Sequence, residues 1–169
     1  MALTKQELID MLQNEVRILV HLAGKVDDKA LNYRPTEKQR STLELLRYLT
    51  IMGPNLVRGI KAGSFDMEAW GKAETHSKTL DLKGAIAAIE QESADYANVL
   101  GGMSEADFAA TMDMFGTVKS KGSHIVYLVA GGHAAYRTQL FCYLKSTGHD
   151  GLNTMNLWGG MDAPMQATS

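Results

Sequence analysis

The chain has 169 residues, of which 45% are hydrophobic and 21% charged, and its formal net charge is -2. This length and apolar content suit one domain, which we expect to span residues 1–169. The dispersed Lys and Arg residues form no basic stretch that would attract nucleic acid or an anionic membrane, so we expect neither partner. The single cysteine, Cys142, excludes an internal disulfide and suits a cytoplasmic location; among apolar neighbours we expect it to be buried.

The N-terminal residues contain no basic patch followed by an apolar core, so we expect no secretory leader. The longest apolar run, residues 125–130, is far shorter than the ~20 residues that span a bilayer. We therefore expect a protein that acts away from membranes.

A first helix is predicted over about residues 5–25. Thr4 and Glu7 have the spacing of a capping box at its start. An apolar stripe with helical spacing follows: Leu8, Leu12, Val16, Leu19 and Ala23. Residues 18–23 are apolar on more than one side, which predicts burial against several neighbours or against a partner chain.

The second helix is predicted to begin at Ser41, because Ser41 and Glu44 form another capping box. Its pattern continues to about residue 62, with a kink or break expected at Gly53-Pro54, because proline removes a backbone donor. Residues 63–78 read as a polar, irregular connection with Trp70 as its anchor.

A third helix is predicted over about residues 82–100, and a short helix over residues 104–111. A connector over residues 112–122 leads to a fourth long helix, about residues 124–146. The tail, residues 149–169, shows no clear period, and we expect Trp158 to pack it onto the rest. Since no segment alternates like a strand, the predicted fold class is all-α, a four-helix bundle with a short extra helix and an irregular C-terminal tail.

One stretch of the last helix, Tyr136-Arg137-Thr138-Gln139-Leu140, resembles the His-Arg-Gly-Gln-Leu motif of the DinB-like (DinB/YfiT-type) family of four-helix bundles. In that family a serine caps the second helix, and Ser41 with Glu44 matches it here. The resemblance implies a three-histidine site for zinc or nickel at positions that fall on Tyr48, Gly132 and Tyr136. None of these is histidine, so the resemblance implies a divergent branch with a degenerate metal site.

The resemblance also gives Ser41, Glu44, Arg137 and Gln139 structural roles, with Glu44 as a candidate partner for Arg137. His133 lies three residues before Tyr136, so both can face one groove. We therefore predict a pocket lined by Tyr48, His133 and Tyr136. The two tyrosine hydroxyls would donate hydrogen bonds to a ligand. The alternative is tight helix packing around the small residues that flank His133.

Three functions stay open at this stage. The first is a bundle without a metal that binds a small molecule in a residual pocket. The second is a metal-dependent hydrolase or a low-molecular-weight-thiol S-transferase, with His21, His133 or a tail carboxylate such as Asp162 as replacement ligands. The third is a structural module; for all three we expect a homodimer.

Overall fold

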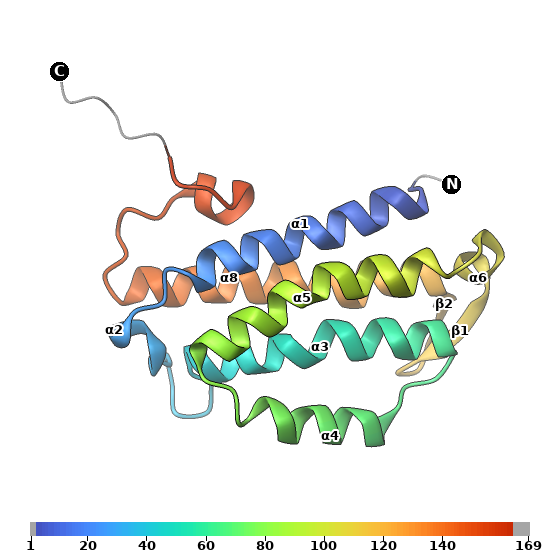
Figure 1. Cartoon of the computed structure of the whole chain (residues 1–169), viewed down its shortest axis with the longest axis horizontal. Helices are drawn as coiled ribbons and strands as arrows, with labels where there is room; N and C mark the ends of the chain where they lie inside the picture. The colour runs from blue at the N-terminus through green and yellow to red at the C-terminus, as the bar shows by residue number, and fades with distance from the viewer. Residues whose placement is uncertain (1–2, 164–169) are drawn as a thin grey trace.

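The computed structural model describes residues 3–163 and is built almost entirely of helices (Figure 1). The all-α prediction is therefore confirmed. In chain order the elements are α1 (Lys5–Ala23), α2 (Asp28–Leu31), α3 (Thr42–Ala62), α4 (Met67–Ser77), α5 (Leu82–Gly101), α6 (Glu105–Ala109), β1 (Thr111–Met114), β2 (Thr117–Ser120), α7 (Lys121–His124), the π-helix η1 (Ile125–Ala130), α8 (Gly131–Ser146) and the π-helix η2 (Met155–Gly159).

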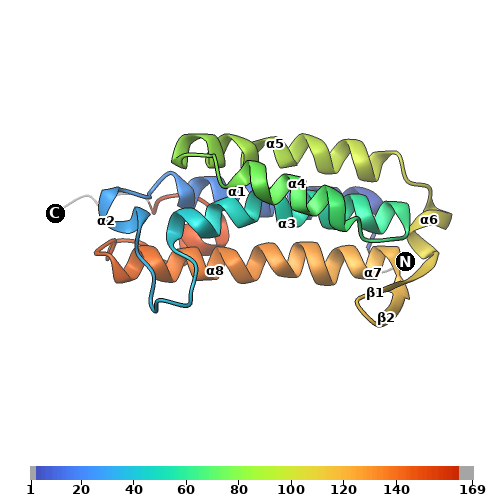
Figure 2. The same cartoon turned by 90° about the horizontal axis from the view of Figure 1, so that it is seen from below.

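The bundle is formed by α1, α3, α5 and the continuous rod α7-η1-α8. Helices α3 and α5 pack along each other, and α1 packs against both α5 and α8. Since α3 also contacts α8, the order around the bundle is α1, α5, α3, α8, with α5 diagonal to α8. Helix α4 runs along the outside and returns the chain, so that α3 and α5 have the same direction (Figures 1 and 2).

The capping boxes that predicted the first two long helices are present. Thr4 and Glu7 cap the N-terminus of α1, and Ser41 and Glu44 cap that of α3. Each pair makes both reciprocal hydrogen bonds of the capping box. Such caps satisfy backbone N–H groups that have no partner within the helix, and each contributes about 1 kcal/mol. The local sequence thus fixes where these helices begin.

Pro54 does not break α3, which runs without interruption from residue 42 to 62. The predicted break is therefore wrong. Pro54 is buried, and the Asn55 side-chain amide next to it donates a hydrogen bond of 2.7 Å to the Ile51 carbonyl. Apolar packing on both sides of the proline holds the helix together and outweighs the cost of one missing backbone bond.

Helix α4 replaces the irregular connection that was predicted for residues 63–78. Asp66 caps the helix by accepting a hydrogen bond from the Ala69 N–H at 2.9 Å. Pairs of opposite charge one turn apart, Glu68 with Lys72 and Glu74 with Lys78, support its exposed face. Its apolar stripe is short, which is why periodicity alone does not reveal it.

The predicted connector over residues 112–122 contains a two-stranded antiparallel hairpin, β1 and β2. Phe115 and Gly116 make the turn, and both have positive φ angles, 55° and 78°. Backbone twist of this kind matches two-residue hairpin turns, but asparagine or aspartate usually stands where Phe115 does. The expectation of no strands is corrected on this point.

The tail lies along α1 through its backbone and polar side chains. Arg17 donates hydrogen bonds to the carbonyls of Gly159 and Gly160, at 2.9 and 3.2 Å. Leu152 and Asn156 are the buried residues of this segment. Trp158 is 67% exposed, and its ring contacts the bundle through the Arg137 guanidinium, 5.2 Å from the ring centroid, so it is not the buried anchor that the sequence predicts. The contact with the tail explains the apolar end of α1, and residues 164–169 lie outside the described part.

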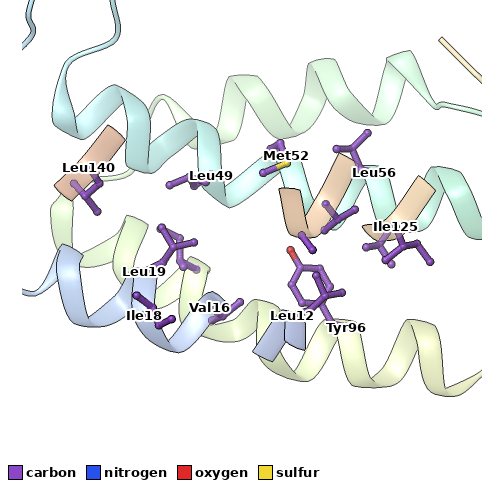
Figure 3. Close-up of a cluster of buried hydrophobic side chains, with 14 of the residues drawn as sticks. Leu12, Val16, Ile18, Leu19, Leu49, Met52, Leu56, Tyr96, Ile125 and Leu140 are labelled. Carbon is purple, nitrogen blue, oxygen red and sulfur yellow. The ribbon is translucent and has the colours of Figure 1, made fainter. Parts of the chain in front are cut away.

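The core fills the space between the four rods with leucine and isoleucine side chains (Figure 3). The α1 stripe is buried as predicted, and Leu12, Leu19, Leu49 and Leu140 are fully shielded from solvent. Within residues 3–163, no helix combines the length and the apolar character needed to cross a bilayer.

Candidate functional site

Tyr48, Gly132 and Tyr136, the positions where the resemblance implies histidines, lie together in one groove. Tyr48 comes from α3 and the other two from α8, where a spacing of four residues places them on one face. The Tyr48 and Tyr136 rings contact edge to face, with centroids 5.1 Å apart. We call this the aromatic groove; its volume is about 710 Å³, and it is lined by Tyr48, Met52, Leu56, Phe65, Met67, Trp70, Phe115, Tyr127, Leu128, Gly131, Gly132, Ala135 and Tyr136.

A chain of aromatic rings forms one wall of the aromatic groove. Tyr48 contacts Trp70 of α4 with centroids 6.1 Å apart, and Trp70 contacts Phe65 at 5.5 Å. Phe65 in turn lies 5.3 Å from Phe115 at the hairpin turn. The two elements that the sequence did not reveal, α4 and the hairpin, therefore supply part of the wall.

Gly132 gives the floor of the groove its shape. A Cβ atom at this position would lie 3.0 Å from Met52 Cε and 3.1 Å from Met52 Sδ. With no side chain at residue 132, Met52 of α3 packs directly against the α8 backbone. The resulting floor is apolar and offers no metal-binding atom apart from a weakly coordinating thioether.

The Tyr48 hydroxyl stays protonated at neutral pH. Its burial, and next the neighbouring Tyr136 hydroxyl, raise the pKa of Tyr48 to about 12. The Arg40 guanidinium lies over the Tyr48 ring, 3.9 Å from its centroid. A neutral phenol can donate a hydrogen bond to a carbonyl or an anion, which suits ligand binding.

These residues do not fit the zinc or nickel site that the resemblance implies. Such a site takes three protein ligands, commonly imidazoles, and leaves one position open. Here one position is a glycine, and Tyr48 would have to lose its proton against a raised pKa. The described residues also contain no cluster of three or more His, Cys, Asp or Glu side chains that could hold a metal ion.

His133 lies in the core instead of in the aromatic groove, and its side chain is completely buried. Its Nε2 atom lies 2.6 Å from the Tyr96 hydroxyl oxygen, and the Tyr96 hydroxyl donates a hydrogen bond to Glu92 Oε2 at 2.8 Å. The predicted pocket of Tyr48, His133 and Tyr136 is thus corrected. Gly132 and Tyr136 lie on the face of α8 that lines the groove. His133 lies on the adjacent face, which points into the core.

Burial favours the uncharged forms of Glu92, Tyr96 and His133, which we call the buried triad. It raises the pKa of Glu92 well above its ordinary value, and it lowers the pKa of His133 to about 4. His133 Nε2 lies 3.4 Å from Glu92 Oε2, but an ion pair there would lose hydration on both sides. The triad joins the diagonal helices α5 and α8 across the centre of the bundle.

A second depression adjoins the aromatic groove and has a volume of about 550 Å³. Tyr48 and Trp70 line both. We call it the basic groove, because five cationic side chains line it against three carboxylates: Arg34, Lys38, Arg40, Arg47 and Lys78 against Glu37, Glu44 and Glu74. The spacing of these residues between Arg34 and Arg47 is the signal that could have revealed it from the sequence.

The remaining motif residues connect parts of the bundle. Gln139 donates a hydrogen bond to the Tyr143 hydroxyl at 2.6 Å, and that hydroxyl donates to the Arg40 carbonyl at 3.1 Å. Arg137 pairs with Glu15 of α1 at 3.3 Å, not with Glu44 as suggested. Glu44 closes the α3 capping box.

Arg34, not Arg137, is the cation that pairs with Glu44, at 3.1 Å. Cys142 is exposed, which corrects the expectation that it is buried. It stands on the outer face of α8.

The candidate replacement ligands do not assemble into one site. His21 lies 3.8 Å from Asp162, and the Asn156 amide lies between them, 3.1 Å from the His21 ring and 2.9 Å from the Asp162 carboxylate. This polar cluster ties the tail to α1. His133, by contrast, contacts Tyr96 and Glu92 in the core.

No protein-family model and no curated protein matches the sequence. A solved structure does: the crystal structure of the DinB-like protein YjoA from Bacillus subtilis superposes with a TM-score of 0.67. The alignment covers 87% of this chain and 95% of YjoA, with 18% sequence identity. The fold is DinB-like. At this identity the likeness concerns the arrangement of the DinB-like bundle, and the chemistry has to be argued from the residues present.

Proposed function

We propose that this DinB-like bundle binds a small molecule in its aromatic groove without a bound metal ion. The observation that carries the proposal is the meeting of Tyr48, Gly132 and Tyr136 in one groove. Tyr48 and Tyr136 contribute two phenol rings in contact, and Gly132 has no side chain, so the groove offers apolar surface and hydroxyl groups for hydrogen bonds.

The size and the lining of the groove support this function. Ligand pockets commonly have volumes of ~300–1,000 Å³ and combine apolar walls with a few polar groups. The aromatic groove has a volume of about 710 Å³, and its polar groups belong mainly to the tyrosines. The single cysteine suits a reducing cytoplasm, where we propose that the protein acts.

A fluorescent probe tests the proposal. N-phenylnaphthylamine is uncharged and brightens in apolar surroundings, and we expect it to bind the purified protein with micromolar affinity in the presence of EDTA. Ala135 lines the groove and is exposed, so Ala135→Trp should fill the groove with little effect on stability. This variant should weaken binding at least about tenfold, the equivalent of 1.4 kcal/mol.

Cys142→Trp is the matched control, because Cys142 is exposed on the same helix, seven residues or about 10 Å further along. It should bind the probe like the unmodified protein. Equal binding by all three proteins would refute the groove as the binding site. One tightly held zinc or nickel ion per chain, found by elemental analysis, would refute the metal-free part of the proposal.

A further inference from the structure

The aromatic groove opens into the basic groove at Tyr48 and Trp70, which line both. We infer that the ligand is a small amphipathic anion, with an apolar body in the aromatic groove and an anionic head at Arg40 and Arg47. This inference rests on the proposed function and narrows the chemical class of its ligand. The head would be a sulfonate, carboxylate or phosphate group.

The charges of the basic groove are only partly balanced. Arg34 pairs with Glu44 at 3.1 Å, and Lys78 pairs with Glu74 at 3.3 Å. Across residues 3–163, no carboxylate lies within ion-pair distance of Arg40 or Arg47, so both cations can accept an external anion.

The two arginines are held in place before any ligand arrives. Arg40 stacks on the Tyr48 ring, 3.9 Å from the centroid. Arg47 Nε donates a hydrogen bond of 2.7 Å to the Leu80 carbonyl, which leaves its two terminal nitrogens for other partners. A guanidinium that is already oriented loses less entropy when it binds a planar or tetrahedral anion.

Helix α3 contributes residues to both grooves. Arg47 lines the basic groove, Tyr48 lines both grooves, and Met52 and Leu56 line the aromatic groove. Within the aromatic groove, Tyr48, Met52 and Leu56 follow one another at intervals of four residues, and Leu56 lies about 12 Å along the helix axis from Tyr48. That length suits a molecule with two or three fused or linked rings, or a medium-length acyl chain.

A pair of probes that differ by one sulfonate group tests the inference. Anilinonaphthalene sulfonate carries a sulfonate that its uncharged parent, N-phenylnaphthylamine, lacks. We expect the unmodified protein to bind the sulfonate about tenfold more tightly than the parent, as one or two charge-assisted hydrogen bonds would provide. Raising the salt concentration should weaken the binding of the sulfonate and leave the binding of the uncharged parent unchanged.

The double variant Arg40→Gln/Arg47→Gln should lose the preference for the sulfonate and keep its affinity for the parent. Lys29→Gln/Lys83→Gln is the matched control, since it removes two exposed cations outside both grooves and should keep the preference. Far-ultraviolet circular dichroism and the urea midpoint establish that each variant is folded. The salt dependence of sulfonate binding is measured on the unmodified protein, so this test does not depend on the folding of a variant.

Each outcome separates the two proposals. If both probes bind equally and Ala135→Trp weakens both, the groove binds ligands but the anionic head is refuted. If neither probe responds to Ala135→Trp, the proposed function itself fails. If sedimentation shows a dimer that Ala135→Trp dissociates, the groove is an interface between copies of this chain, and the inference is overturned.

Discussion

Gly53 of α3 should be the least replaceable glycine in the bundle, because the buried triad passes beside it. A Cβ atom at residue 53 would lie 1.8 Å from the Tyr96 hydroxyl oxygen and 2.8 Å from His133 Nε2. No atom tolerates the first distance, so Gly53→Ala must displace Tyr96, His133 or α3 itself. The triad and the glycine therefore depend on each other.

The expected cost follows from three effects. Alanine is a better helix former than glycine and would add ~0.5–1 kcal/mol of stability at an unhindered site. Overpacking a filled core costs ~1–3 kcal/mol, and separating buried hydrogen-bond partners costs a further ~1–3 kcal/mol. The steric and polar costs outweigh the gain in helix propensity, and we expect Gly53→Ala to lower the free energy of unfolding by about 3 kcal/mol.

Urea unfolding at neutral pH, followed by circular dichroism, measures this free energy. Gly71→Ala is the control, since Gly71 lies inside α4 and a Cβ atom there would contact nothing within 4 Å. It should raise the stability by ~0.5–1 kcal/mol. A Gly53→Ala protein as stable as the unmodified one would refute the described packing of Tyr96 and His133.

Three further changes test other parts of the structure. Above its ordinary pKa of 4.5, Glu92 loses its proton more readily in the unfolded chain than in the fold, so its contribution to the free energy of unfolding falls with rising pH. The lowered pKa of His133 has the opposite effect between about pH 4 and pH 6.5, so Glu92→Gln should make the stability measured by urea unfolding rise more steeply with pH in that range. Arg137→Met should cost about 3 kcal/mol in the same assay by leaving Glu15 unpaired, and adding Glu15→Leu should recover most of it. Ser41→Ala should lower the thermal midpoint, at a cost of about 1 kcal/mol, by removing the α3 cap.

The long helices could be predicted from the sequence because their signals are local. The capping boxes at Thr4 and Ser41 and the apolar stripes of α1 and α5 need no knowledge of distant residues. Helix α4 could not, because most of it faces solvent and its support comes from charge pairs. The hairpin was hidden as well, since Phe115 is an unusual residue for a positive φ angle.

The candidate site was predictable only in part. The resemblance placed Tyr48 and Tyr136 together, and their rings do meet. His133 was assigned to the wrong face, because a spacing of three residues permits a shared face but does not require it. Only the distant partners Glu92 and Tyr96, on a diagonal helix, decide that His133 faces the core.

The aromatic groove can be tested most directly through the methionine methyl groups, observed by NMR in the presence of EDTA. Met52 forms the groove floor, and Met67 is an exposed residue at its wall. We predict that N-phenylnaphthylamine shifts both resonances and leaves those of Met103 in the core and Met161 in the tail unchanged. Shifts confined to other methionines, or shifts that appear only after zinc or nickel is added, would contradict a metal-free binding groove.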